Sequence, residues 1–185
     1  MLSLPLDDDT ELRTLEPWHH RQLADFADRA RDFVGPWLSW VTTIVDEDSA
    51  KQWLHDRAVK RAEDRFHMWG LWHGDRLVGG VVYRIFDTYD KVCEIGAWLA
   101  PEATGRGLMT KACVHIIDWA FIERGMNRVE WRCETANAAS RSVAERLGMT
   151  LDGTLRQSYR NARGEYADDE VWSMLADEWK APPNR

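Results

Sequence analysis

A short glycine-containing segment constrains the fold of this chain more than any other feature. The segment Thr104-Gly-Arg-Gly-Leu-Met-Thr110 follows an apolar, strand-like stretch that ends at Leu99, and apolar side chains recur at helical spacing from Leu108 onward. A strand that turns through glycines into a helix presents successive backbone N–H groups, and the positive end of the helix dipole, to an anion. We therefore expect a phosphate site here. In this site Gly105 and Gly107 would let the phosphate approach the backbone closely, Arg106 would supply positive charge and Thr110 would donate a hydroxyl hydrogen bond.

The two standard nucleotide-binding motifs do not fit this segment. Thr110 stands in place of the third glycine of a GxGxxG fingerprint, and no GKS or GKT sequence marks a P-loop. The segment also follows a strand in the middle of the chain, whereas a dinucleotide-binding unit has it after the first strand. Two glycines before a helix also occur in plain turns, so the segment alone does not identify its ligand.

The remaining pattern predicts one mixed α/β (α+β) domain. Apolar residues alternate in some stretches and recur every three or four residues in others, which is typical of strands and of amphipathic helices. The expected strands cover residues 11–15, 66–72, 77–86, 92–99, 128–133, 149–159 and 165–175, and the expected helices cover 18–34, 48–64, 108–124 and 137–147. No repeat or linker divides them, so we assign residues 1–180 to a single domain and 181–185 to a frayed tail.

Charge and composition argue against several classes of protein. The net charge is -7 and the pI is near 5.4, so we expect no general attraction to nucleic acid or to an anionic membrane. No apolar run could span a bilayer, and the first residues lack the pattern of a signal peptide, which indicates a soluble, cytoplasmic protein. The histidines show no metal-ligand spacing, so no metal is expected. Cys93, Cys113 and Cys133 are widely separated and are expected to be reduced, apolar core residues.

Several short motifs, in a fixed order, resemble the GNAT acyltransferase superfamily. They are Glu94-Ile-Gly-Ala-Trp-Leu99, Thr104-Gly-Arg-Gly-Leu-Met-Thr110, Asn137-Ala-Ala-Ser140 and Glu145-Arg-Leu-Gly-Met149. Within that superfamily the chain is most similar to the RimJ/RimL group of protein N-terminal acetyltransferases. The further matching segments are Leu12-Arg-Thr-Leu-Glu-Pro17, Gly35-Pro-Trp-Leu-Ser-Trp40, Asp168 and Trp172-Ser-Met-Leu175. The resemblance covers nearly the whole chain and is far more specific than two glycines.

The resemblance implies both the fold and the acyl donor. The expected fold is a single GNAT-type domain, with a mostly antiparallel sheet splayed between its fourth and fifth strands and helices on both faces. Acetyl-CoA would lie in that opening as co-substrate. The residues that the resemblance assigns to it are Trp98, Leu99, Gly105, Arg106, Gly107, Leu108, Met109, Thr110, Asn137 and Ser140. Asn137 also suits the N-cap of the helix at 137–147 on propensity alone, and we expect it to fill both roles. Two positions depart from the family's Q/R-x-x-G-x-G/A signature, because Thr104 replaces the Gln or Arg and Met109 replaces the final Gly or Ala.

Two residues are expected to carry the chemistry of acyl transfer, which needs a neutral amine and a proton for the departing thiolate. Ser140 matches a family hydroxyl near the CoA sulfur and would protonate the thiolate; a simple first-turn serine is the alternative. Glu94 matches a glutamate that some GNAT enzymes use as general base, and its apolar neighbours could raise its pKa. A strand glutamate that faces solvent or pairs with arginine is its alternative. Residues 155–159, where some RimL-type enzymes carry a glutamate, hold no carboxylate, which leaves Glu94 or water alone.

The acceptor is expected to be a primary amine. Trp37 and Trp40 lie in a segment that overlooks the acceptor in the GNAT fold, and Trp72, Tyr166 and Asp168 are further candidates. Indole rings favour flat or cationic ligands. The resemblance leaves two sources of the amine open: the N-terminus of a protein or peptide, as in RimL-like enzymes, or a small molecule such as an aminoacyl-nucleotide antibiotic.

A hypothesis of another class is a non-catalytic, acyl-CoA-binding regulatory domain that keeps the fold. Thr104 and the missing carboxylate at residues 155–159 leave it open, whereas Gly107, Asn137 and Ser140 favour an enzyme. A longer acyl donor and a homodimer are both compatible with the sequence.

Overall fold

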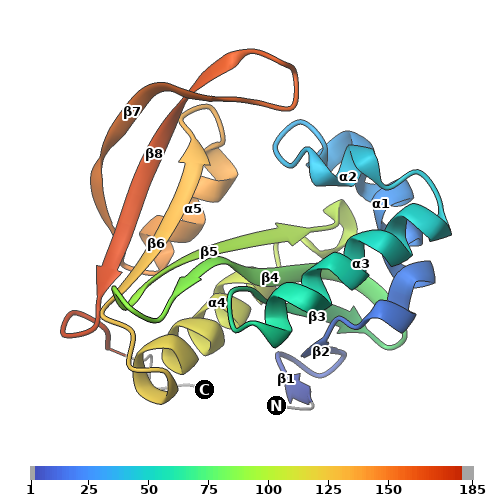
Figure 1. Ribbon diagram of the computed structural model, residues 1–185, viewed down its shortest axis with the longest axis horizontal. Coiled ribbons are helices and arrows are strands. Elements are labelled where there is room, and N and C mark those ends of the chain that lie inside the picture. The colour runs from blue at the N-terminus through green and yellow to red at the C-terminus, as the bar shows by residue number, and fades with distance from the viewer. Residues whose placement is uncertain (1–2, 181–185) are drawn as a thin grey trace.

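Eight strands form one sheet in the computed structural model, which describes residues 3–180 (Figure 1). The strand order is β1-β2-β3-β4-β5-β6-β8-β7, and every neighbouring pair is antiparallel except β5 and β6. The strands are β1 Ser3–Pro5, β2 Thr10–Thr14, β3 His67–His73, β4 Arg76–Asp87, β5 Val92–Leu99, β6 Arg128–Glu134, β7 Thr150–Arg160 and β8 Tyr166–Leu175. The tail predicted at residues 181–185 lies outside the described residues.

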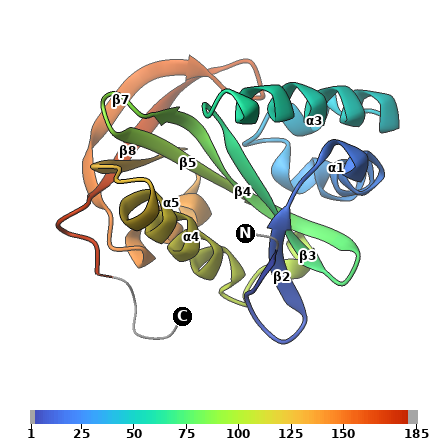
Figure 2. The same cartoon turned by 60° about the horizontal axis from the view of Figure 1, so that its bottom comes forward.

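Helices cover both faces of the sheet (Figure 2). One face carries α1 His20–Val34, α2 Trp40–Thr43 and α3 Glu47–Ala62, and the other carries α4 Leu108–Asp118 and α5 Ala138–Arg146. Each face has its own apolar core, with Phe26 and Trp98 on the α1–α3 face and Ile95 and Trp131 on the α4–α5 face. The division follows from the alternation of side chains along each strand. Among the described helices, none is long and apolar enough to cross a membrane.

The fold class and the order of the longer elements predicted from the sequence are confirmed, although the four-residue helix α2 was not predicted and two further elements differ. Strand β1 was not predicted, because three residues are too few to show an alternating pattern. The helix expected at 108–124 is α-helical only to Asp118 and continues as a π-helix over Trp119–Glu123. The Tyr83 hydroxyl donates a hydrogen bond to the Ile116 carbonyl just before this change, and such a contact between distant segments leaves no trace in the local pattern.

The sheet opens between β5 and β6, which are the fourth and fifth of the predicted strands, as the resemblance predicts. Only four residue pairs join the two strands, from Val92–Arg128 to Ile95–Trp131. Beyond Ile95, β5 continues to Leu99 beside β4, while β6 continues to Glu134 beside β8, so the two strands diverge (Figure 1). The divergence leaves one edge of each strand without a neighbouring strand, and backbone groups on such an edge are available to a ligand.

We predict that Gly80→Ala destabilises the β4–β5 side of this opening. The Trp98 ring lies directly over Gly80, and a Cβ added there would come within 2.1 Å of the ring. Overpacking of this kind lowers the free energy of unfolding by about 1–3 kcal/mol. Urea denaturation measures the effect. Gly153→Ala on β7 is the control, because a Cβ there meets no atom within 4 Å, and equal stability of the two variants would contradict the prediction.

Candidate active site

The predicted phosphate segment forms a turn at the N-terminus of α4. Gly105 and Gly107 adopt left-handed backbone conformations, with φ of 78° and 71°, and Gly107 is the N-cap of the helix. No side chain caps this helix end, and a Cβ added to either glycine would meet no atom within 4 Å. The glycines are therefore required by the backbone conformation, and the first turn of α4 presents uncapped N–H groups to open space. This arrangement fits a pyrophosphate.

Basic and hydroxyl side chains surround this turn. Arg106, the side chain predicted to bind phosphate, forms an ion pair with the β1–β2 connection: its Nη2 lies 2.8 Å from Asp7 Oδ2. Thr110 Oγ1 accepts a hydrogen bond from Arg146 Nε at 3.4 Å. Sequence reasoning missed Arg146 as a second cation here, although the family-like segment from Glu145 to Met149 contained it. Thr104 donates its hydroxyl proton to the Pro101 carbonyl at 2.8 Å, which ties this departure from the family signature to its own turn.

Asn137 and Ser140 lie on the other side of the opening, at the start of α5. Asn137 is the N-cap, as predicted, and its Oδ1 accepts a hydrogen bond from the Ser140 backbone N–H at 3.1 Å. The Asn137 side-chain amide keeps its N–H groups for another acceptor. Ser140 Oγ accepts a hydrogen bond from Trp131 Nε1 at 3.0 Å. That contact fixes the hydroxyl through its oxygen and does not use its proton, which lies close to the Cys133 thiol.

Glu94 lies within the paired part of β5, opposite Glu130 of β6. Its side chain is 4% exposed, and its Oε1 lies 2.9 Å from Arg84 Nε. Burial raises the pKa of the Glu94 carboxyl above its ordinary value, and the positive charges of Arg84 and Arg132 oppose the rise. The arginine pairing named as the alternative for this residue is therefore present, together with the raised pKa that suits a base.

The three predicted acceptor tryptophans have different surroundings. Trp37 is half-buried on the connection between α1 and α2, and the Arg163 guanidinium lies 5.8 Å from its ring centroid. Trp40 is partly buried, with its ring 5.3 Å from that of Trp98. Trp72 is 2% exposed in the core of the α1–α3 face, beneath α1 and η1 Pro17–His19. Its burial leaves almost no surface for an acceptor, so Trp72 is corrected to a core residue.

Tyr166 and Asp168 belong to the β7–β8 hairpin. Tyr166 is 67% exposed, and the Arg160 guanidinium lies over its ring. Asp168 Oδ1 accepts a hydrogen bond from the Gln157 backbone N–H at 2.9 Å, at an irregularity in the β7–β8 pairing where Gln157 has a φ of 48°. Asp168 therefore stabilises an unusual strand conformation, and this contact provides no acceptor site of its own.

Two buried carboxyl groups near the opening were missed by sequence reasoning. Glu134, the last residue of β6, is 5% exposed, and Asp169, directly opposite it on β8, is 8% exposed. The alternation in residues 128–134 offered a signal, because Glu130 and Glu134 share a face on which an apolar pattern would be expected if the face were simply core. The partner on β8 is 35 positions away and could not be assigned without the strand register.

The cysteines and other metal-binding side chains do not form a reactive or metal centre. All three cysteines are free and buried, as expected, and burial raises the pKa of Cys133 to about 11 and that of Cys113 to about 12. These thiols stay protonated near neutral pH. Within residues 3–180, no group of three or more His, Cys, Asp or Glu side chains is arranged to hold a metal ion.

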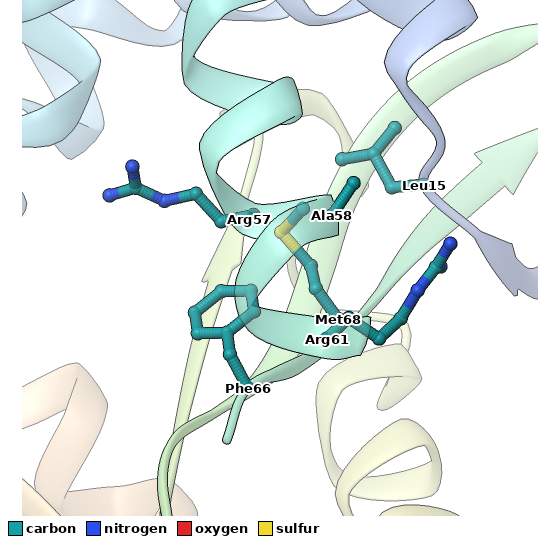
Figure 3. Close-up of a pocket in the computed structure, with 6 residues that line it drawn as sticks. All are labelled: Leu15, Arg57, Ala58, Arg61, Phe66 and Met68. Carbon is teal, nitrogen blue, oxygen red and sulfur yellow. The ribbon is translucent and has the colours of Figure 1, made fainter. Parts of the chain in front are cut away.

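A small cavity of about 10 Å³ lies elsewhere, between α3 and β3 (Figure 3). Its volume is close to the minimum for one water molecule, so it can hold neither an acyl donor nor an acceptor. It is lined by Leu15, Arg57, Ala58, Arg61, Phe66 and Met68.

Known proteins match both the sequence and the fold. A family model described as an acetyltransferase (GNAT) domain matches residues 11–150. The putative ribosomal N-acetyltransferase YdaF of Bacillus subtilis is 29% identical over 97% of this chain and 98% of its own length. RimL, a ribosomal alpha-N-protein acetyltransferase solved with coenzyme A, has a TM-score of 0.89 at 19% identity, over 96% of this chain and 99% of its own. The microcin self-immunity acetyltransferase MccE, solved with acetyl-CoA and AMP, has a TM-score of 0.85 at 19% identity, over 92% and 94%.

We predict that Arg106→Gln weakens acetyl-CoA binding at the α4 turn. The change removes a charge-assisted hydrogen bond to phosphate, and at this half-exposed position we expect the KM for acetyl-CoA to rise roughly three- to tenfold. Initial rates at varied acetyl-CoA measure it. Arg65→Gln, which removes an exposed arginine that pairs with Glu63, serves as control. A KM that rises for the amine but not for acetyl-CoA would contradict the assignment.

Proposed function

Because the chain belongs to the GNAT acetyltransferase family, we propose that it transfers the acetyl group of acetyl-CoA to the N-terminal amine of a protein. The observation that carries the proposal is the β5–β6 opening, with the uncapped α4 turn on one side and Asn137 and Ser140 on the other. Similarity along nearly the whole chain to YdaF, named as a putative ribosomal N-acetyltransferase, favours a ribosomal protein as the acceptor.

The donor would be held from both sides of the opening. The α4 turn and Arg106 would bind the pyrophosphate, and the free amide N–H of Asn137 would donate to the pantetheine arm. Trp98 is 5% exposed, so any contact that it makes with the donor falls to its main chain. Ser140 contacts Trp131 on the α4–α5 face. With the donor's sulfur beside Ser140, the amine has to approach from the opposite, α1–α3 face.

Direct attack of the amine would form the new C–N bond as the C–S bond breaks. The amine nitrogen loses one proton and the departing thiolate gains one, so that an amide and CoASH are the products. Ser140 would supply the proton to the sulfur and regain one from solvent. Glu94 would take the amine proton through water, since it pairs with Glu130 one residue before the opening begins. Positioning of the amine next to a reactive thioester contributes the rest of the rate.

A second acceptor class is a small-molecule amine that also carries a flat ring, such as an aminoacyl-nucleotide antibiotic. Trp37 and Trp40 favour it, because partly exposed indoles stack on flat rings. For either acceptor we infer that the protein works in the cytoplasm, since three free thiols suit a reducing compartment.

We predict that CoASH is released with peptides that carry a free N-terminus, faster than with aminoacyl-nucleotide analogues. A thiol assay with both panels measures this. Ser140→Ala should lower kcat about tenfold or more, because the thiolate loses its proton donor, while acetyl-CoA affinity stays unchanged. A wild-type protein that binds acetyl-CoA but releases no CoASH with any amine would make it a binding domain, and faster turnover of the analogues would establish the second acceptor class.

We predict that Glu94→Gln removes the acidic limb of the pH profile. A base acts when ionised, so the wild-type kcat should rise with pH through the raised pKa of Glu94 and then level off. Glutamine cannot titrate, so the variant should show a low rate without that rise. Glu123→Gln, at the end of the π-helix that follows α4, is the control. An unchanged profile would remove Glu94 from the mechanism.

A further inference from the structure

Glu134 stands where β5 and β6 have already diverged. It lies three residues beyond Trp131, the last residue of β6 that pairs with β5, and Trp98 lies three residues beyond the matching Ile95. Both are therefore roughly 10 Å past the last pair, on opposite sides of the opening. Strand alternation directs Glu134 to the α1–α3 face, because Trp131 and Cys133 lie in the core of the other face. This is the face from which the amine would approach.

The Glu134 carboxyl is buried, and only one of its two oxygens accepts a hydrogen bond from a described residue. Its Oε2 accepts a hydrogen bond from Arg163 Nη2 at 3.1 Å, whereas its Oε1 is buried and has no hydrogen-bond partner among the described residues. The whole side chain is 5% exposed. Burying a carboxylate oxygen without a hydrogen-bond donor costs free energy. A further N–H group placed next to Oε1 would remove that cost.

The neighbours of Glu134 include a second carboxyl group and one hydroxyl, and its Oε1 still has no hydrogen-bond partner among the described residues. Asp169 lies directly opposite on β8 and forms no ion pair within residues 3–180. Burial raises the pKa of Asp169; the positive charges of Arg132 and Arg84 oppose the rise, and Glu134 adds to it. Burial, followed by hydrogen bonding to Glu134, also raises the pKa of the Tyr159 hydroxyl, so this hydroxyl is a donor close to the Glu134 carboxyl. Two carboxyl groups in a poorly hydrated position favour a cation.

Arg163 is a cation held between two separate parts of the chain. It belongs to the turn of the β7–β8 hairpin, whose tip lies near the α1–α2 connection in Figure 1. Its guanidinium binds Glu134 on one side and lies 5.8 Å from the Trp37 ring centroid on the other. The arginine side chain is 44% exposed, so it can leave this position without unfolding the hairpin. A carboxylate and an indole face are also the partners that bind an ammonium group.

We infer that Glu134, Asp169 and Trp37 form a subsite for an ammonium group of the acceptor, which enters as the Arg163 guanidinium moves out. This inference rests on the proposed function, since it concerns the acceptor of the same reaction. An ammonium group brings three N–H donors, enough for the unpartnered Oε1 of Glu134 and for Asp169. The group is either the α-ammonium that is to be acetylated or a side-chain ammonium of the next residue.

Equilibrium binding to the CoA-saturated protein tests the subsite independently of turnover. Three C-terminally amidated tetrapeptides separate the two sources: Ser-Gln-Ala-Ala has only the α-ammonium, N-acetyl-Ser-Lys-Ala-Ala has only the side-chain ammonium, and N-acetyl-Ser-Gln-Ala-Ala has neither. We expect Glu134→Gln to weaken calorimetric binding of at least one cationic peptide about tenfold or more, and to leave the neutral peptide unchanged. The peptide that responds identifies the source of the ammonium.

Matched variants isolate the contribution of each side chain. Glu165→Gln removes the other carboxylate that binds Arg163, at 3.2 Å but 69% exposed at the hairpin tip, and should change no affinity. Arg163→Gln should tighten binding of the responding peptide roughly two- to fivefold, because the competing cation is gone, whereas Arg156→Gln, on the exposed β7 strand, should not. When the protein also carries Glu134→Gln, Arg163→Gln should no longer tighten peptide binding.

Two results would overturn the subsite: wild-type protein that binds no cationic peptide better than the neutral one, or Glu134→Gln with unchanged affinities. Neither result bears on the CoASH-release assay, which decides the proposed function separately. Near-wild-type thermal unfolding of Glu134→Gln shows that the isosteric change has not disrupted the strand.

Discussion

The end of pairing between β5 and β6 is the constraint on which the rest of the structure depends. After Ile95 and Trp131 each strand keeps one neighbour and loses the other, because β5 follows β4 and β6 follows β8. A sheet normally satisfies backbone groups on both sides of an inner strand, so an opening in its middle is stable when a ligand or side chains complete it. The α4 turn, the cap of α5 and the carboxyl of Glu134 all border this one opening.

The two faces of the sheet at the opening differ in chemistry. On the α4–α5 face, Trp131 and Cys133 pack in an apolar core and Ser140 is the polar group held against it. On the α1–α3 face, buried carboxyls alternate with arginines, as in the contacts of Glu94 with Arg84 and Arg132. Buried ion pairs contribute little net stability compared with apolar packing, so such a row favours a role in binding over a role in folding. A donor on one face and a charged acceptor on the other would meet at the gap.

How much the sequence predicts depends on how local each feature is. The α4 turn and the Asn137 cap each lie within seven residues, and backbone and capping preferences acting over that distance predicted both. The burial of Trp72 depends on α1 and η1 packing over β3, and the pairing of Glu134 with Asp169 depends on the register of two strands that are far apart in the chain. Strand alternation predicts which face a side chain occupies, but it cannot predict which helix covers that face. The sequence therefore predicted the fold and the glycine turn before α4, and missed the carboxyl pair.

The proposed contacts with the two substrates differ in the same way, since those with the donor are local in the chain and those with the acceptor come from distant segments. In the proposed reaction, donor recognition would use backbone N–H groups of the α4 turn and a helix cap, which many side-chain changes elsewhere leave intact. The contacts around Glu134 use side chains from β6, β8, the hairpin turn and the α1–α2 connection, four segments that can vary independently. A change at Arg163 or Trp37 would alter the charge and shape met by the acceptor without disturbing the strands that form the opening. A fold of this kind could thus keep one donor while its acceptor changes, because two of the proposed acceptor contacts, Arg163 and Trp37, lie on connections, whereas the proposed donor contacts lie at helix ends.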